Sequence, residues 1–156
     1  MADVIAKPRH QRHVTSRLRR RRDDIWIATT ALAAAMLALP FAQSSWHGPE
    51  VASVLAVAAT ALFAGQRWAI AVIVVAELLL MPTIWPRAFL DDSGAMMARV
   101  AALSTLVAIV PGILSMRRAA AALVLVTGQR RTRENCRRFH MGLVLSGLIA
   151  TILPLL

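Results

Sequence analysis

Long apolar runs alternate with short basic runs along this chain, and this alternation restricts the possible folds more than any other feature. Of the 156 residues, 58% are hydrophobic and only 17% are charged. A soluble domain carries about a quarter of its residues as charged side chains, spread over its surface. A helix needs about 20 predominantly apolar residues to cross the hydrocarbon core of a bilayer. The pattern therefore predicts an all-α fold, a polytopic membrane helix bundle with about five transmembrane helices.

Five apolar segments are the predicted membrane spans. They cover residues 25–42, 49–65, 68–85, 96–116 and 141–156. The preceding residues, 1–24, form a basic tail in which we expect little fixed structure, because few of its side chains could be buried. This divides the chain into a basic tail, 1–24, and a transmembrane helical domain, 25–156.

Proline and glycine mark the breaks between these segments. Residues 65–67 predict a tight turn, and Pro82 and Pro86 are expected to end or kink the third span. The apolar run 119–126 is too short to cross a bilayer at about 1.5 Å per residue. It is either a continuation of the fourth helix or a piece lying on the membrane surface, and we expect it to stop near Gly128.

The distribution of basic residues predicts the orientation of the chain. Sixteen of the eighteen lysines and arginines lie in the tail, at Arg67 or in 117–139, and five crossings place all sixteen on one side. Cytoplasmic loops carry the excess of basic residues, so the N-terminus is predicted to be cytoplasmic. The preference for arginine over lysine, together with abundant alanine, favours a bacterial source and hence the inner membrane.

The four tryptophans give the same topology. Trp26, Trp46, Trp68 and Trp85 all fall at predicted span ends, two on each side of the membrane. Tryptophan is enriched at both membrane–water interfaces, where its amphipathic ring lies at the level of the headgroups. Their placement supports the borders of the first three spans.

Glu77 is the candidate functional residue within the membrane, near the middle of the third span. An ionised, unpaired carboxylate at that depth costs at least about 2.5–3.5 kcal/mol. We therefore expect it to be neutral, hydrogen-bonded or paired with a cation. It either stabilises contacts with a neighbouring helix or a partner subunit, or it serves as a proton or cation relay.

The arginine clusters are the candidate contacts to other molecules. They comprise Arg19, Arg20, Arg21, Arg22, Arg130, Arg131, Arg137 and Arg138. Such clusters attract anionic lipid headgroups, with each charge near the surface adding about 1 kcal/mol. An acidic partner protein is the alternative. Nucleic acid is not expected, because no aromatic residue interleaves the basic tail to provide a stacking surface.

Small residues recur at four-residue spacing in three of the spans. The three stripes are Ala52, Ala56, Thr60 and Ala64; Ser104, Ala108 and Gly112; and Gly142, Ser146 and Ala150. Small residues let helix backbones approach closely. The stripes predict helix packing, either within the chain or with another protein.

The sequence contains no phosphate-binding loop, zinc-protease motif or nucleophile elbow, so no catalytic residue, cofactor or metal site is predicted. His47 has no partner at ligand spacing, and the thiol of Cys136 is expected to be reduced in the cytoplasm. The acidic pair Asp91 and Asp92 is interpreted as part of a turn.

Three functions are compatible with these features. The leading hypothesis is a non-enzymatic accessory, scaffold or assembly subunit that packs against other membrane proteins. The second is a small homo-oligomeric transporter or channel in which Glu77 couples proton or cation movement. The third is a membrane enzyme acting on lipid, for which Asp91 and Asp92 would be the acidic residues to test.

Overall fold

The computed structural model describes residues 9–42, 48–90 and 95–152. Within these ranges the chain forms five α-helices and no strand. The helices are α1 (Arg9–Ala42), α2 (Gly48–Phe63), α3 (Ala69–Leu90), α4 (Ala95–Val126) and α5 (Arg133–Ile152). The prediction of an all-α fold is confirmed, and each predicted apolar segment coincides with one helix over most of its length.

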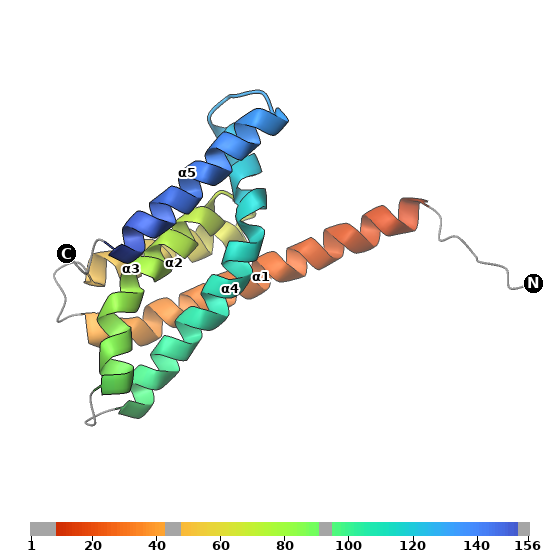
Figure 1. Cartoon of the computed structure of the whole chain (residues 1–156). Helices are drawn as coiled ribbons and strands as arrows, with labels where there is room; N and C mark the ends of the chain where they lie inside the picture. Colours follow the sequence, from red (N-terminus) through yellow and green to blue (C-terminus); the bar gives the residue numbers. More distant parts are fainter. Residues whose placement is uncertain (1–8, 43–47, 91–94, 153–156) are drawn as a thin grey trace, which may run out of the picture.

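The first helix extends well before the apolar segment that it contains. Residues 9–24, for which we expected little fixed structure, are helical here, and the N-terminal half of α1 projects beyond the other four helices (Figure 1). Arginine has a high helix propensity, and residues 9–24 contain neither glycine nor proline. Arg20 and Asp24 are also four residues apart, so opposite charges lie on adjacent turns.

A tight turn joins α2 to α3, as predicted for residues 65–67. Gly65 has a φ of 88°, a left-handed conformation that glycine adopts without a Cβ clash. The backbone N–H of Gln66 donates to the carbonyl of Ala61 at 3.0 Å, and that of Gly65 donates to Leu62 at 2.9 Å. These two bonds form the helix-ending arrangement known as a Schellman motif.

The third helix is the centre of the bundle, because it packs against each of the other four helices. Its two parts, Ala69–Pro82 and Ile84–Leu90, are bent by 47° relative to each other. Proline lacks the N–H that would bond to the preceding turn, which accounts for the bend. The kink expected from Pro82 is therefore present, and the helix continues past Pro86.

The fourth helix continues without interruption to Val126. The apolar run 119–126 is thus an extension of the fourth helix, one of the two alternatives left open by the sequence. The turn that follows contains Gly128, whose φ is 71°, and the N–H of Gln129 donates to the carbonyl of Val124 at 3.0 Å, so the chain leaves the helix near Gly128 as predicted.

Two glycines bring helices into close contact with α3. A Cβ added at Gly112 of α4 would lie 2.6 Å from Cγ2 of Val74, and one at Gly147 of α5 would lie 3.2 Å from Cδ1 of Leu78. The small-residue stripe of the fourth span therefore packs inside the chain. In α5 the packing glycine is Gly147, whereas Gly142 of the predicted stripe has no atom within 4 Å of its added Cβ.

The outward surface of the bundle is apolar along two helices. Along α4, large exposed side chains recur every three or four residues: Met96, Val100, Leu103, Val107, Val110 and Leu114. Along α5 the exposed side chains include Met141, Val144, Leu145, Leu148, Ile149 and Ile152. We call these the α4 stripe and the α5 face. Helices that are apolar on both their inward and outward sides are typical of buried or membrane-spanning segments.

One helix in the described part of the chain, Met96–Val126, is by itself long and apolar enough to cross a membrane. A second candidate arises if the bent pair in α3 is treated as one span, and Gly48–Phe63 is apolar but only 16 residues long. The structure thus supports an all-helical chain with one clear candidate span among the described residues. The arrangement of five spans predicted from the sequence is not confirmed.

Candidate functional site: arginine-lined hollows around Asp24

Asp24 joins three elements, α1, the α2–α3 turn and α4, in one ion-pair cluster. Its Oδ2 accepts a hydrogen bond from Nε of Arg67 at 3.2 Å, and its Oδ1 accepts one from Nη1 of Arg118 at 3.2 Å. Nη2 of Arg118 also donates to the hydroxyl oxygen of Ser115. Asp24 is 8% exposed and Ser115 is 3% exposed. The cluster therefore fixes α1, the α2–α3 turn and α4 at the same end of the bundle.

The local sequence explains why Asp24 points inward. It occupies the same helix face as Ile27, Ala28 and Ala31, which are fully buried at spacings of three, four and seven residues. A buried carboxylate requires compensating partners, and the two arginines supply charge-assisted hydrogen bonds.

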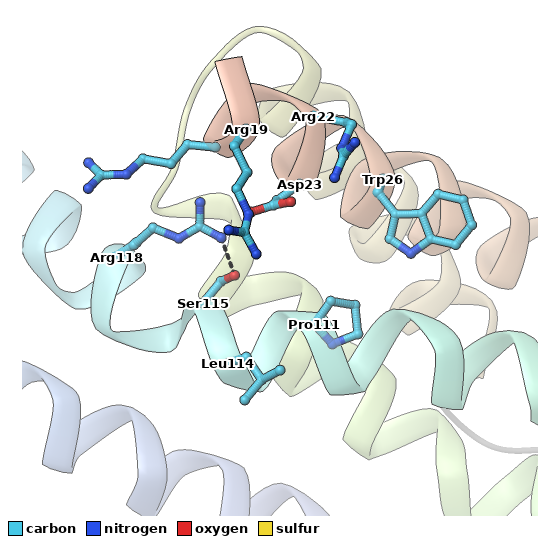
Figure 2. Close-up of a pocket in the computed structure, with 9 residues that line it drawn as sticks. Arg19, Arg22, Asp23, Trp26, Pro111, Leu114, Ser115 and Arg118 are labelled. Atoms are coloured by element: carbon cyan, nitrogen blue, oxygen red, sulfur yellow. Dashed lines mark hydrogen bonds between the residues drawn. The ribbon is translucent and has the colours of Figure 1, made fainter. Parts of the chain in front are cut away.

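A hollow of about 760 Å³ lies between α1 and α4 on one side of this cluster. We call it the Trp26 hollow. It is lined by Arg19, Arg20, Arg22, Asp23, Trp26, Pro111, Leu114, Ser115 and Arg118. Figure 2 shows the side chains of α1 facing those of α4 across it, with Arg118 bonded to Ser115. Four guanidinium groups and one carboxylate give the lining a clear excess of positive charge.

A second hollow, of about 980 Å³, lies on the side of the α2–α3 turn. We call it the Trp68 hollow. Six arginines and Asp24 contribute its charges, and the arginines are Arg17, Arg20, Arg21, Arg67, Arg118 and Arg131. Arg20 and Arg118 line both hollows. The two hollows therefore form one basic region around the N-terminal part of α1.

This region contains some of the arginines singled out in the sequence. Arg19, Arg20, Arg21, Arg22 and Arg131 line one hollow or the other. Their role as contacts to lipid or protein stays a prediction, but the structure brings them together with two arginines from other elements.

The other three predicted arginines lie elsewhere. Arg138 pairs with Glu134 four residues earlier on α5, and Arg130 and Arg137 are exposed. None of the three lines either hollow. The arginines of segment 117–139 are thus divided between the hollows and exposed positions on α4, on α5 and in the loop between them.

Glu77 lies at the middle of α3 and is completely buried. Neither of its carboxyl oxygens has a hydrogen-bond partner among the described residues. The close contact of Val74 with Gly112 and the hydrogen bond from Nε of Arg99 to the carbonyl of Ala88 set an antiparallel register between α3 and α4. On α4, Thr105 and Ile109 are also buried and lie about one helical turn apart.

The remaining chemistry-bearing residues form no cluster in the described part of the chain. There, no three His, Cys, Asp or Glu side chains are close enough to hold a metal ion. Cys136 is a half-buried free thiol. His47, Trp46, Asp91 and Asp92 lie outside the described residues, so the alternative assigned to the acidic pair is untested.

Sequence reasoning missed the ion-pair cluster of Asp24, Arg67, Arg118 and Ser115. A signal for it was present, because Asp24, Arg67 and Arg118 all occur at the ends of apolar segments assigned to the same membrane side. Assigning these residues to the same membrane side predicts that they lie at the same end of the helices, but it does not predict which helices are neighbours.

Comparison of the chain with protein-family models, with curated proteins and with solved structures finds no match.

Proposed function

We propose that this chain is a multi-pass protein of the bacterial inner membrane, with a cytoplasmic N-terminus, and that it acts as a non-enzymatic accessory, scaffold or assembly subunit. The observation that carries this proposal is the outward-facing hydrophobic surface formed by the α4 stripe and the α5 face. Surfaces of this kind mark contacts with membrane or with other proteins.

The dimensions of the α4 stripe fit a membrane. From Met96 to Leu114 the stripe is about 27 Å long at 1.5 Å per residue, close to the hydrocarbon thickness of about 30 Å. Arg117, three residues after Leu114, is exposed. The shorter helix α2 can be accommodated by local thinning of the bilayer, at a modest energetic cost.

The position of the arginines supports the proposed orientation. The ion pairs of Asp24 hold the end of the basic tail, Arg67 and Arg118 at one end of the bundle. These are the elements that the positive-inside rule assigns to the cytoplasm. Trp26 and Trp68 line the two hollows at the same end, where an interfacial aromatic belt is expected.

The α5 face supports packing against another membrane protein. Gly142 has open space around it and Ser146 is exposed, so two small residues of the fifth stripe are not used in the packing of this chain. Ser146 also lines an apolar groove of about 430 Å³ between α2, α3 and α5. A helix from another subunit could approach closely along this surface.

Membrane extraction followed by native mass spectrometry tests the proposal. We expect the chain to stay in the membrane pellet after extraction at alkaline pH, and to co-purify with unlike membrane subunits in mild detergent. Gly142→Leu should reduce co-purification, whereas Leu145→Ile on the same helix should not. Extraction into the soluble fraction would refute the membrane assignment, and a monomer without partners would refute the subunit role.

A second candidate function is a small homo-oligomeric transporter or channel that uses Glu77. The observation in its favour is a fully buried carboxyl group without a described hydrogen-bond partner on the central helix. Proton-dependent flux in liposomes that is abolished by Glu77→Gln and retained in Thr105→Val would support it. No flux with the wild-type protein would exclude it.

A further inference from the structure

We propose that the Trp26 hollow binds one anionic phospholipid, with its phosphodiester on the arginines and an acyl chain along the α4 stripe. This deepens the proposed function and rests on it, because a membrane-embedded chain meets such lipids at this depth. In this proposal the lipid binds at a defined site, and not only through a general attraction between basic residues and headgroups.

The excess of positive charge in the Trp26 hollow favours binding of an anion. Arg19, Arg20 and Arg22 form no ion pair with any carboxylate in the described ranges, and Asp23 is the only acid in the lining. Several guanidinium groups around one space repel each other unless a negative charge lies among them. Their planar donor forks match the oxygens of a phosphate group.

Arg118 gives the hollow a fixed donor group. Its guanidinium is held by Asp24 through one nitrogen and by Ser115 through the other. Its orientation is therefore set before any ligand binds, which lowers the entropy lost on binding. The arginines of α1 are exposed and adjust to the ligand from the opposite wall.

The apolar part of the hollow favours a lipid over a soluble phosphate. Trp26 is 57% exposed and Leu114 is 80% exposed, and both lie beside the arginines. From Leu114 the α4 stripe continues through Val110 and Val107 to Leu103, about 16 Å along the helix. This equals about half the thickness of the hydrocarbon core, which is the depth reached by the chains of one leaflet.

Lipid binding to the full chain in uncharged detergent tests the site, with native mass spectrometry as the readout. The probes are phosphatidylglycerol, phosphatidylcholine and inorganic phosphate. We expect the wild-type chain to prefer phosphatidylglycerol over phosphatidylcholine by about tenfold or more, from about 1 kcal/mol per basic residue. The double variant Arg19→Gln, Arg22→Gln should lose most of this preference.

Matched variants separate the site from general electrostatic attraction. Arg130→Gln, Arg137→Gln removes the same charge from exposed positions outside the hollow and should keep the preference. Leu114→Gln should weaken phosphatidylglycerol binding severalfold, whereas Leu145→Gln on α5 should not. Arg19→Lys, Arg22→Lys keeps the charge and should retain part of the preference, which shows that the loss in the glutamine variant is not misfolding.

The outcomes that would overturn the proposal are specific. Equal loss in both arginine-to-glutamine pairs would indicate diffuse attraction. Displacement of phosphatidylglycerol by millimolar inorganic phosphate, with no effect of Leu114→Gln, would indicate a site for a free anion. A chain that resists alkaline extraction but shows no lipid preference refutes this inference alone, whereas an extractable chain refutes the proposed function as well.

Discussion

Asp24 is the residue that links α1, the α2–α3 turn and α4 at one end of the bundle. Its carboxylate is shared by arginines 43 and 94 residues away along the chain, and it is largely buried although a basic run ends two residues earlier. Its neighbour Asp23 is half-buried and makes no ion pair among the described residues. The two aspartates therefore provide a matched comparison at adjacent positions.

Asp24→Asn is expected to destabilise the protein, because it leaves Arg67 and Arg118 facing each other without a negative charge between them. The arginines are partly exposed, so the loss lies between the values for exposed and buried pairs, about 1–2 kcal/mol. Thermal unfolding in detergent, followed by helical circular dichroism, measures it. Asp23→Asn serves as the control and should change stability by less than about 0.5 kcal/mol. Equal effects of the two substitutions would contradict the assigned role of Asp24.

Glu77 differs from Asp24, because its buried carboxyl group has no hydrogen-bond partner among the described residues. A buried polar group that lacks a hydrogen bond destabilises a protein by about 1–3 kcal/mol. Glu77→Met, which is similar in volume and apolar, is therefore expected to raise the unfolding temperature. Glu77→Gln keeps the unsatisfied polar atoms and should leave it nearly unchanged. A lower unfolding temperature for the methionine variant would show that Glu77 has a partner in the assembled protein.

At the scale of elements, helix contact is decided by a few small residues. Gly112 allows α4 to lie against Val74, and Gly147 allows α5 to lie against Leu78. Gly142, on the same helix as Gly147, has open space around it. Spacing alone placed Gly112 and Gly142 in equivalent stripes and left Gly147 out, although Gly142 is the one with open space around it.

Gly112→Ala is expected to destabilise the α3–α4 contact, because its new Cβ would clash with the stiff side chain of Val74. Overpacking of this kind costs about 1–3 kcal/mol. Gly142→Ala should instead stabilise α5 slightly, by up to about 1 kcal/mol from helix propensity. Unfolding in detergent distinguishes the two. Recovery of stability in the double variant Gly112→Ala, Val74→Ala would identify the clash as the cause, and no recovery would point to a different one.

At the scale of the whole molecule, the proposed topology predicts which residues face each side of the membrane. In a Cys136→Ser background, His10→Cys and Arg130→Cys are expected to react with an impermeant thiol reagent from the cytoplasmic side. His47→Cys and Asp91→Cys should react from the opposite side. Labelling of positions 130 and 47 from the same side would contradict the five-span arrangement.

The helical class and the positions of the apolar segments could be predicted from the sequence alone. These properties depend on local composition along the chain, which a linear pattern records directly. The tight turn at Gly65, the kink near Pro82 and the stop at Gly128 were also predicted, because each depends on the backbone of a few consecutive residues. The helix over residues 9–24 was not predicted, because it depends on the helix propensity of arginine and not on burial.

The contacts between residues far apart in the sequence could not be predicted in this way. Helices that are apolar around most of their circumference carry no polar face to fix their rotation, so their contacts are set by packing across the bundle. The pairing of Asp24 with Arg67 and Arg118, the use of Gly147 instead of Gly142, and the burial of Glu77 within one chain all follow from that rotation. The alternation of apolar and basic runs thus predicts where the helices lie along the chain, and helix packing places arginines from separate runs around one hollow.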